Sequence, residues 1–262
     1  MRHTGGVYKN MFGNNINKKR HLVYRFVTYH STGGTYTTGS GFFINAKHFL
    51  TCFHVAFGAE LRKIRNLPEF QRITGNNEHS KLENFYQTRI SKAEVELPDN
   101  SRHKVELQSF DEEHDIALFK LPAKLKIKIS KIDWRTSVNY GDRVFFGGFP
   151  THHDYQPDKA PFAVHEGIVS AFVDTTIGGG KYQHIQINSI NLGGNSGAPL
   201  FRNRGTTVIG IINGNMNWGR DDIIVQDLNS RYIKDSLRTP LSIAYATPLK
   251  LLKDFICKTV AV

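Results

Sequence analysis

The sequence predicts an all-β fold, a barrel or a sandwich, and three observations point to it. Stretches rich in β-branched and aromatic residues recur along the chain, for example at residues 22–30, 143–149 and 207–214. Turn-forming segments rich in Gly, Thr and Ser separate them, as at residues 31–41. The length of 262 residues is one that all-β proteins reach as a single folding unit.

The remaining segments complete this picture. Residues 1–21 form a basic arm, and residues 92–97 and 104–110 predict a hairpin around the turn residues 98–101. Residues 58–90 contain helix-like stretches broken by Pro68 and then a polar stretch, which indicates an insertion on a loop. Residues 247–260 alternate apolar and basic residues at helical spacing and predict a C-terminal helix.

Charge and cysteine content limit the function classes. The net charge is +11, and no acidic residue precedes Glu60, so the N-terminal region either binds nucleic acid or an acidic partner, or is a solvated positive face. No apolar run approaches the length of a membrane span and no secretory signal is visible. We expect Cys52 and Cys257 to be free thiols, which fits a reducing, cytoplasmic location.

Residues 192–200, LGGNSGAPL, place Ser196 in a glycine-rich turn of the kind that exposes a nucleophile and backbone N–H groups. A serine nucleophile also needs a base and a residue that orients the base. No histidine follows Ser196 and no aspartate precedes His54, so with His54 as base only the order His, Asp, Ser remains. Asp115 and Asp111 both fit, and Asp115 is preferred because an apolar strand follows it.

Three segments resemble the trypsin-like peptidases, specifically their HtrA-like branch. They are LTCFHVAFG with His54, DEEHDIALFKL with Asp115, and GNSGAPLF with Ser196. Further similarity at residues 39–44, 141–150, 166–172, 208–214 and 243–252 extends the resemblance over roughly residues 22–258. The chain ends soon after the C-terminal helix, so we expect no PDZ domain.

The resemblance implies one peptidase domain made of two packed six-stranded barrels, residues 22–130 and 131–262. His54 would be the general base, Asp115 its orienting group and Ser196 the nucleophile, with an oxyanion hole formed by the N–H groups of Gly194 and Ser196. The substrate would be a protein or peptide, and no metal or cofactor is required. The pairs Cys52–His54 and His152–His153 lack the full ligand set of a zinc site.

Two departures from the family pattern carry predictions. Ala198 replaces the usual Gly, and its methyl group is expected to crowd the cleft. Asn195 replaces the Asp that pairs with a new N-terminus in the secreted branch, so activation by N-terminal trimming is not indicated.

The substrate pocket implied by the resemblance has no acidic residue, which predicts an apolar or small residue before the cleaved bond. The residues expected to line it are Ser189, Ile190, Asn213, Gly214 and Asn215. Residues 215–240 are predicted to form a long loop. Our hypothesis is that this loop is regulatory and orders the oxyanion turn when a protein partner binds. Two other functions stay open: a catalytically silent binding module of the same fold, and a nucleic-acid-associated protein that uses the basic arm.

Overall fold

The structure is a computed structural model. It describes residues 18–31, 36–58, 66–75, 79–122, 125–134, 138–150, 161–177, 180–202, 205–226 and 232–260. Most of the basic arm and the pair His152–His153 therefore lie outside the described residues. Within the described ranges, no helix has the length and apolar character needed to cross a bilayer.

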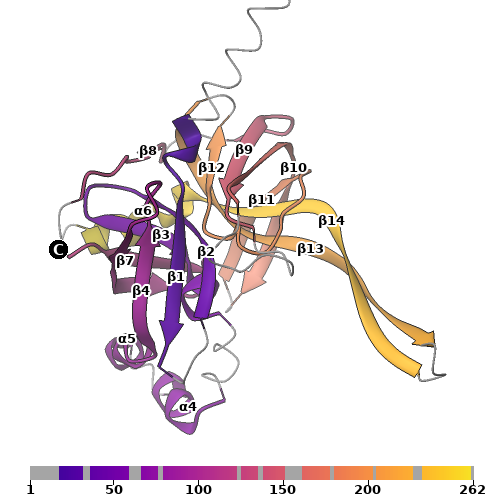
Figure 1. The fold of residues 1–262 in the computed structure, drawn as a ribbon, viewed down its shortest axis with the longest axis horizontal. Coiled ribbons are helices and arrows are strands. Elements are labelled where there is room, and N and C mark those ends of the chain that lie inside the picture. The colour runs from indigo at the N-terminus through magenta and orange to yellow at the C-terminus, as the bar shows by residue number, and fades with distance from the viewer. Residues whose placement is uncertain are drawn as a thin grey trace, which may run out of the picture.

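Strands dominate the fold, as predicted (Figure 1). In chain order the elements are β1 (Tyr24–His30), β2 (Tyr36–Phe43), β3 (His48–Cys52), α2 (Phe53–Phe57), α4 (Pro68–Gly75), α5 (His79–Gln87), β4 (Ile90–Glu96), β5 (Arg102–Lys104), β6 (Glu106–Asp111), β7 (Ile116–Lys120), β8 (Lys131–Ile132), β9 (Arg143–Gly148), β10 (Ala163–Ile177), β11 (Gly180–Ile187), β12 (Pro199–Arg202), β13 (Thr207–Gln226), β14 (Tyr232–Pro248) and α6 (Leu249–Val260).

The first half of the chain forms a curled antiparallel sheet in the order β5-β4-β1-β2-β3-β7-β6. The predicted hairpin is present, but its second arm is divided at Val105: β5 pairs with β4, whereas β6 pairs with β7. Val105 is buried and donates its N–H to the carbonyl of Ala93, 2.9 Å away. Because of this division, residues 102–111 supply both edge strands of the sheet, β5 at one edge and β6 at the other.

The second half forms the sheet β12-β9-β10-β11-β14-β13-β8, and an additional pairing between β12 and β13 closes six of its strands into a barrel. The seventh strand, β8, pairs with β13 in parallel. The all-β, two-barrel prediction is confirmed, with the first barrel present as a curled sheet. The predicted C-terminal helix is α6.

The main hydrophobic core is shared between the two halves. It combines first-sheet residues such as Phe26 and Phe119 with Phe145, Phe201 and Ile211 of the second sheet and with Leu252 of α6. A smaller core lies inside the second barrel. The two halves are therefore packed on common apolar side chains.

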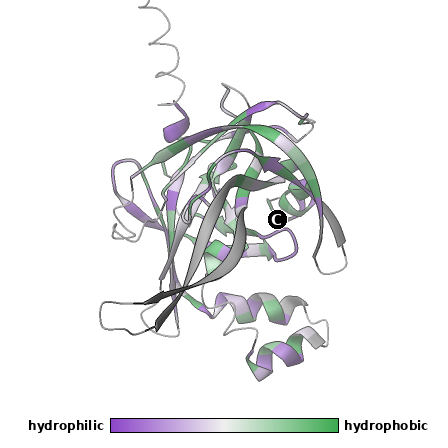
Figure 2. Ribbon diagram, turned by 90° about the vertical axis from the view of Figure 1, so that its right-hand side faces the viewer, coloured by the Kyte–Doolittle hydropathy of each residue, from purple (hydrophilic) through white to green (hydrophobic). Residues whose placement is uncertain are grey.

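The insertion after α2 differs from its prediction in two ways. Pro68 begins α4, because a proline lacks only an N–H that the first helical turn does not use. The stretch read as polar forms α5, whose Phe85 and Tyr86 are buried. Figure 2 shows both helices outside the sheets, with hydrophilic and hydrophobic segments mixed along them.

Helix α5 supports the segment that carries His54. The ring of Tyr86 lies 5.2 Å from that of Phe53 and 4.6 Å from that of Phe57, the first and last residues of α2. Its hydroxyl donates to Glu112 Oε2 at 3.3 Å. The insertion thus contacts both the histidine helix and the loop that ends at Asp115.

The described part of residues 215–240, which was predicted to be a long loop, belongs instead to a β-hairpin. Strands β13 and β14 pair from Gly210–Pro248 out to Gln226–Tyr232. Figure 1 shows this hairpin projecting beyond the body of the second barrel.

The last residues of the basic arm are fixed to the second barrel. Lys19 is buried, and its Nζ lies 3.8 Å from the ring centroid of Phe145. Burial lowers the pKa of Lys19 to about 8, although Glu166 opposes the shift. For Lys19, the interpretation as part of a solvated positive face is wrong.

Candidate functional site

His54 and Asp115 are held against each other by three contacts. The Phe53 N–H donates to the Asp115 carbonyl at 3.0 Å, which fixes the start of α2 beside β7. The His54 N–H donates to Asp115 Oδ1 at 2.9 Å, and His54 Nδ1 lies 2.7 Å from Asp115 Oδ2. Both carboxylate oxygens therefore point at His54, and Nδ1 carries the proton in the arrangement that leaves Nε2 free to accept one.

The local backbone separates Asp115 from its competitor. Asp115 has a φ of 59°, a conformation that non-glycine residues rarely adopt and that clusters at functional sites. Asp111 instead binds the neighbouring histidine, with Oδ2 2.6 Å from His114 Nδ1. Of the two aspartates, only Asp115 contacts His54.

Ser196 lies at a tight turn between the two sheets. Gly194 and Gly197 have φ values of 93° and 88°, which favour glycine. A Cβ on Gly197 would lie 1.9 Å from the carbonyl oxygen of Ser40, so this position has no room for a side chain. The Ser40 N–H donates to the Ser196 carbonyl at 2.9 Å, which ties the serine to β2 of the other sheet.

Gly39 shows how close Ser196 comes to the histidine helix. A Cβ built on Gly39 would lie 2.5 Å from Val55 Cγ1 and 3.1 Å from the carbonyl oxygen of Ser196. Val55 follows His54 directly, so one glycine touches both segments. Among the described residues the Ser196 hydroxyl has no hydrogen-bond partner. Catalytic hydrogen bonds are often long in unliganded enzymes.

A serine that the sequence analysis did not single out connects the expected oxyanion turn to two other segments. Ser40 is fully buried, and its hydroxyl donates to the Gly194 carbonyl at 2.8 Å. The same oxygen accepts the N–H of Phe149 at 3.1 Å. Ser40 thus fixes the direction of the peptide that follows Gly194.

Asn195 and Ala198 both face inward. The Asn195 amide nitrogen lies 3.1 Å from His165 Nε2, a contact that no sequence pattern predicted. The His165 ring stacks on Phe146 with centroids 4.8 Å apart. Ala198 is fully buried in the core of the second barrel, so the expectation that its methyl group crowds the cleft is wrong.

The residues expected to line a substrate pocket lie on two facing segments. Ser189 is buried and Ile190 is 48% exposed. Asn191, which was not among the predicted residues, donates from Nδ2 to the Gly214 carbonyl at 2.7 Å and joins the two segments. Asn213 donates to Thr247 Oγ1 at 2.8 Å. The side chain of Asn215 lies outside the described residues.

The electrostatics of the His54 pair favour a charged imidazole. Burial acts to lower the pKa of His54, but the charge and hydrogen bond of Asp115 outweigh it, and the net shift is upward. The His54 side chain is still 41% exposed, so substrate can reach it.

Cys52 lies beneath this pair. Its thiol donates to the Ile212 carbonyl at 3.2 Å, and ligand atoms of Cys52, His54 and Asp115 all lie within 4.8 Å of one another. Burial and the nearby Asp115 charge raise the pKa of Cys52 well above its ordinary value, which disfavours the thiolate that a metal needs. Cys52 and Cys257 are free thiols, as expected.

Residues 39–211, well over half of the chain, match a family model described as the trypsin-like peptidase domain. The chain belongs to this family. The matched range begins at Gly39 and contains His54, Asp115 and Ser196. No curated protein sequence is significantly similar to this trypsin-like peptidase domain.

Among solved structures, the active form of the Rv3671c protease from M. tuberculosis is similar to this trypsin-like peptidase domain. The TM-score is 0.63 at 14% sequence identity, and the match covers 95% of this chain and 86% of the other. At this identity the likeness establishes the chymotrypsin-like fold.

Proposed function

We propose that this chain is a serine endopeptidase with His54, Asp115 and Ser196 as its catalytic triad. The observation that carries the proposal is the 2.7 Å contact between His54 Nδ1 and Asp115 Oδ2. It gives the imidazole the orientation that a general base requires, next to a turn that presents a serine from the other sheet.

In the proposed reaction, His54 Nε2 takes the proton from Ser196 Oγ as that oxygen bonds to the carbonyl carbon of the substrate. The N–H groups of Gly194 and Ser196 stabilise the negative oxygen that forms. The imidazolium, stabilised by Asp115, then gives its proton to the leaving amine as the C–N bond breaks. Water, deprotonated by His54, hydrolyses the acyl-enzyme and restores Ser196.

The substrate is a protein or peptide chain. The described residues proposed to line the pocket are uncharged: Ser189, Ile190, Asn213 and Gly214. An uncharged pocket favours an apolar or small side chain, because a buried cation would lack a counter-charge. Profiling with a peptide library tests this, and dominant cleavage after Lys or Arg would contradict it.

A fluorophosphonate probe tests the nucleophile. The wild-type protein should be labelled, and Ser196→Ala should abolish labelling. The matched control is Ser170→Ala, which removes an exposed serine on β10 whose hydroxyl donates to the Gln186 carbonyl at 3.2 Å and accepts from Gln186 Nε2 at 3.3 Å. Failure of the folded wild-type protein to react, with or without a protein activator, would favour a silent binding module.

A further inference from the structure

A cavity of about 530 Å³ opens between the start of β1, the turn from β4 to β5 and the segments on either side of residues 151–160. We call it the arginine pocket, after the residues that define it: Arg20, Arg25, Glu96, Arg102, Phe149 and Phe162. Its size is typical of sites for small ligands or one or two side chains.

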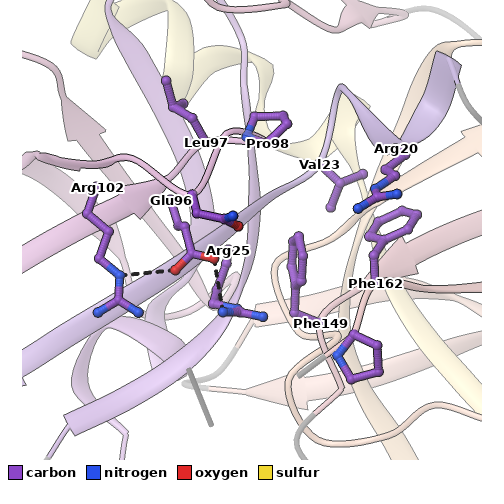
Figure 3. Close-up of a pocket in the computed structure, with 11 residues that line it drawn as sticks. Arg20, Val23, Arg25, Glu96, Leu97, Pro98, Arg102, Phe149 and Phe162 are labelled. Atoms are coloured by element: carbon purple, nitrogen blue, oxygen red, sulfur yellow. Dashed lines mark hydrogen bonds and ion pairs between the residues drawn. The ribbon is translucent and has the colours of Figure 1, made fainter. Parts of the chain in front are cut away.

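The arginine pocket carries excess positive charge. Glu96 is bound on both oxygens, by Arg25 Nη1 at 3.0 Å and by Arg102 Nε at 3.0 Å, as the dashed lines in Figure 3 show. Arg20 lines the same cavity and is exposed. The pocket lining therefore holds three guanidinium groups and one carboxylate, which two of them bind. A further anion would be attracted here, because guanidinium groups bind carboxylates in a planar, two-point geometry.

The opposite wall of the pocket is aromatic. Figure 3 shows Phe149 and Phe162 facing the Arg25–Glu96 pair, and their ring centroids are 5.5 Å apart. The Arg25 guanidinium carbon lies 4.9 Å from the Phe149 centroid. Both rings are only half-buried, so an apolar group could pack on them.

We propose that the arginine pocket binds an acidic peptide segment. A carboxylate of the segment would pair with Arg102 and Arg20, and a neighbouring apolar side chain would cover Phe149 and Phe162. A nucleoside phosphate is the competing occupant: it would bring two negative charges next to the Glu96 carboxylate, whereas a peptide carboxylate brings one.

Two hydrogen bonds join the pocket to the nucleophile turn. The Phe149 N–H donates to Ser40 Oγ at 3.1 Å, and Ser40 Oγ donates to the Gly194 carbonyl at 2.8 Å. A peptide that packs on Phe149 restrains this connection. If the proposed peptidase function holds, on which this step rests, occupancy of the pocket should raise turnover by about fivefold or more.

The test uses a fluorescein-labelled pentapeptide with four glutamates around one phenylalanine, and a matched peptide with glutamines. Binding is followed by fluorescence anisotropy on the Ser196→Ala protein, so that the probe is not cut. The acidic peptide should bind about tenfold tighter than the glutamine peptide, and Arg102→Gln should weaken its binding about tenfold. Arg143→Gln is the control: it removes the same charge from an arginine that is 64% exposed and outside the pocket.

Equal binding of both peptides, or equal loss in Arg102→Gln and Arg143→Gln, would overturn the site. Displacement of the acidic peptide by adenosine monophosphate at lower concentration than by its unlabelled copy would assign the pocket to nucleotides instead. Binding that leaves the turnover of the active wild-type enzyme unchanged would overturn the coupling. A wild-type protein without any activity would refute the peptidase proposal, while the anisotropy result would still decide the site.

Discussion

Replacing Ser40 with alanine should damage both the fold and the proposed oxyanion turn. The substitution removes the donor to the Gly194 carbonyl and the acceptor of the Phe149 N–H. Ser40 is fully buried and Gly194 is also buried, so water does not readily replace the lost hydroxyl.

The expected loss of stability follows from the two polar groups that Ser40→Ala leaves without a partner. A buried polar group that loses its partner costs about 1–3 kcal/mol, so with two such groups the free energy of unfolding should fall by about 2–6 kcal/mol. The part of this loss that comes from the unpaired Gly194 carbonyl destabilises the peptide next to the proposed oxyanion hole. If the turn must be reordered at that cost before reaction, the labelling rate falls about ten- to a hundredfold.

The assay is the second-order rate of fluorophosphonate labelling, measured beside urea unfolding. Ser130→Ala is the matched control, since Ser130 is also buried but its hydroxyl has no hydrogen-bond partner among the described residues. It should change neither quantity appreciably. A Ser40→Ala protein that is labelled within twofold of the wild-type rate would refute the role assigned to this hydroxyl.

Three further predictions follow from the site. Asp115→Asn should lower kcat/KM for peptide hydrolysis about 10⁴-fold, whereas Asp111→Asn should change it little because Asp111 binds His114; equal losses would contradict the assignment. In denaturant unfolding, Gly197→Ala should lower the free energy of unfolding by more than about 3 kcal/mol, because a Cβ there would lie 1.9 Å from the Ser40 carbonyl oxygen. The control Gly141→Ala should lower it by only about 1–2 kcal/mol, because Gly141 has a similar φ of 81° but no atom lies within 4 Å of its Cβ position. In the Ser196→Ala protein, NMR should give His54 a pKa above the ordinary 6.5, and adding Asp115→Asn should lower it. Activity needs the neutral imidazole, so it should be lost as the pH falls through this raised pKa. A midpoint below 6.5 would argue against the Asp115 contact.

The sequence contained enough to anticipate the fold class and the residues now proposed as the triad, because each lies in a short local pattern. The choice of Asp115 over Asp111 rested only on the apolar strand that follows. What separates them in the structure is a backbone turn with a φ of 59° and the capture of Asp111 by His114, and both depend on the folded loop.

Other features needed the tertiary structure. The contacts of Ser40 with Gly194 and of Asn195 with His165 join segments distant in sequence, and no local pattern announces them. The inward direction of the Ala198 methyl group likewise depends on the second core. Helix α5 did leave a signal, since Leu82, Phe85 and Tyr86 have the spacing of one apolar helix face.

The shared core described for the two sheets has a consequence for how the molecule can fail. A fragment that stopped near residue 130 would keep Phe26 and Phe119 but lack Phe145, Phe201 and Ile211, which belong to the same core. Either half alone would expose these apolar side chains to water, so we expect neither half to be stable by itself. Thermal unfolding should therefore be cooperative, and enzymatic activity should be lost in the same transition as tertiary structure. The same apolar core then also sets the spacing between the proposed base, His54, and the proposed nucleophile, Ser196.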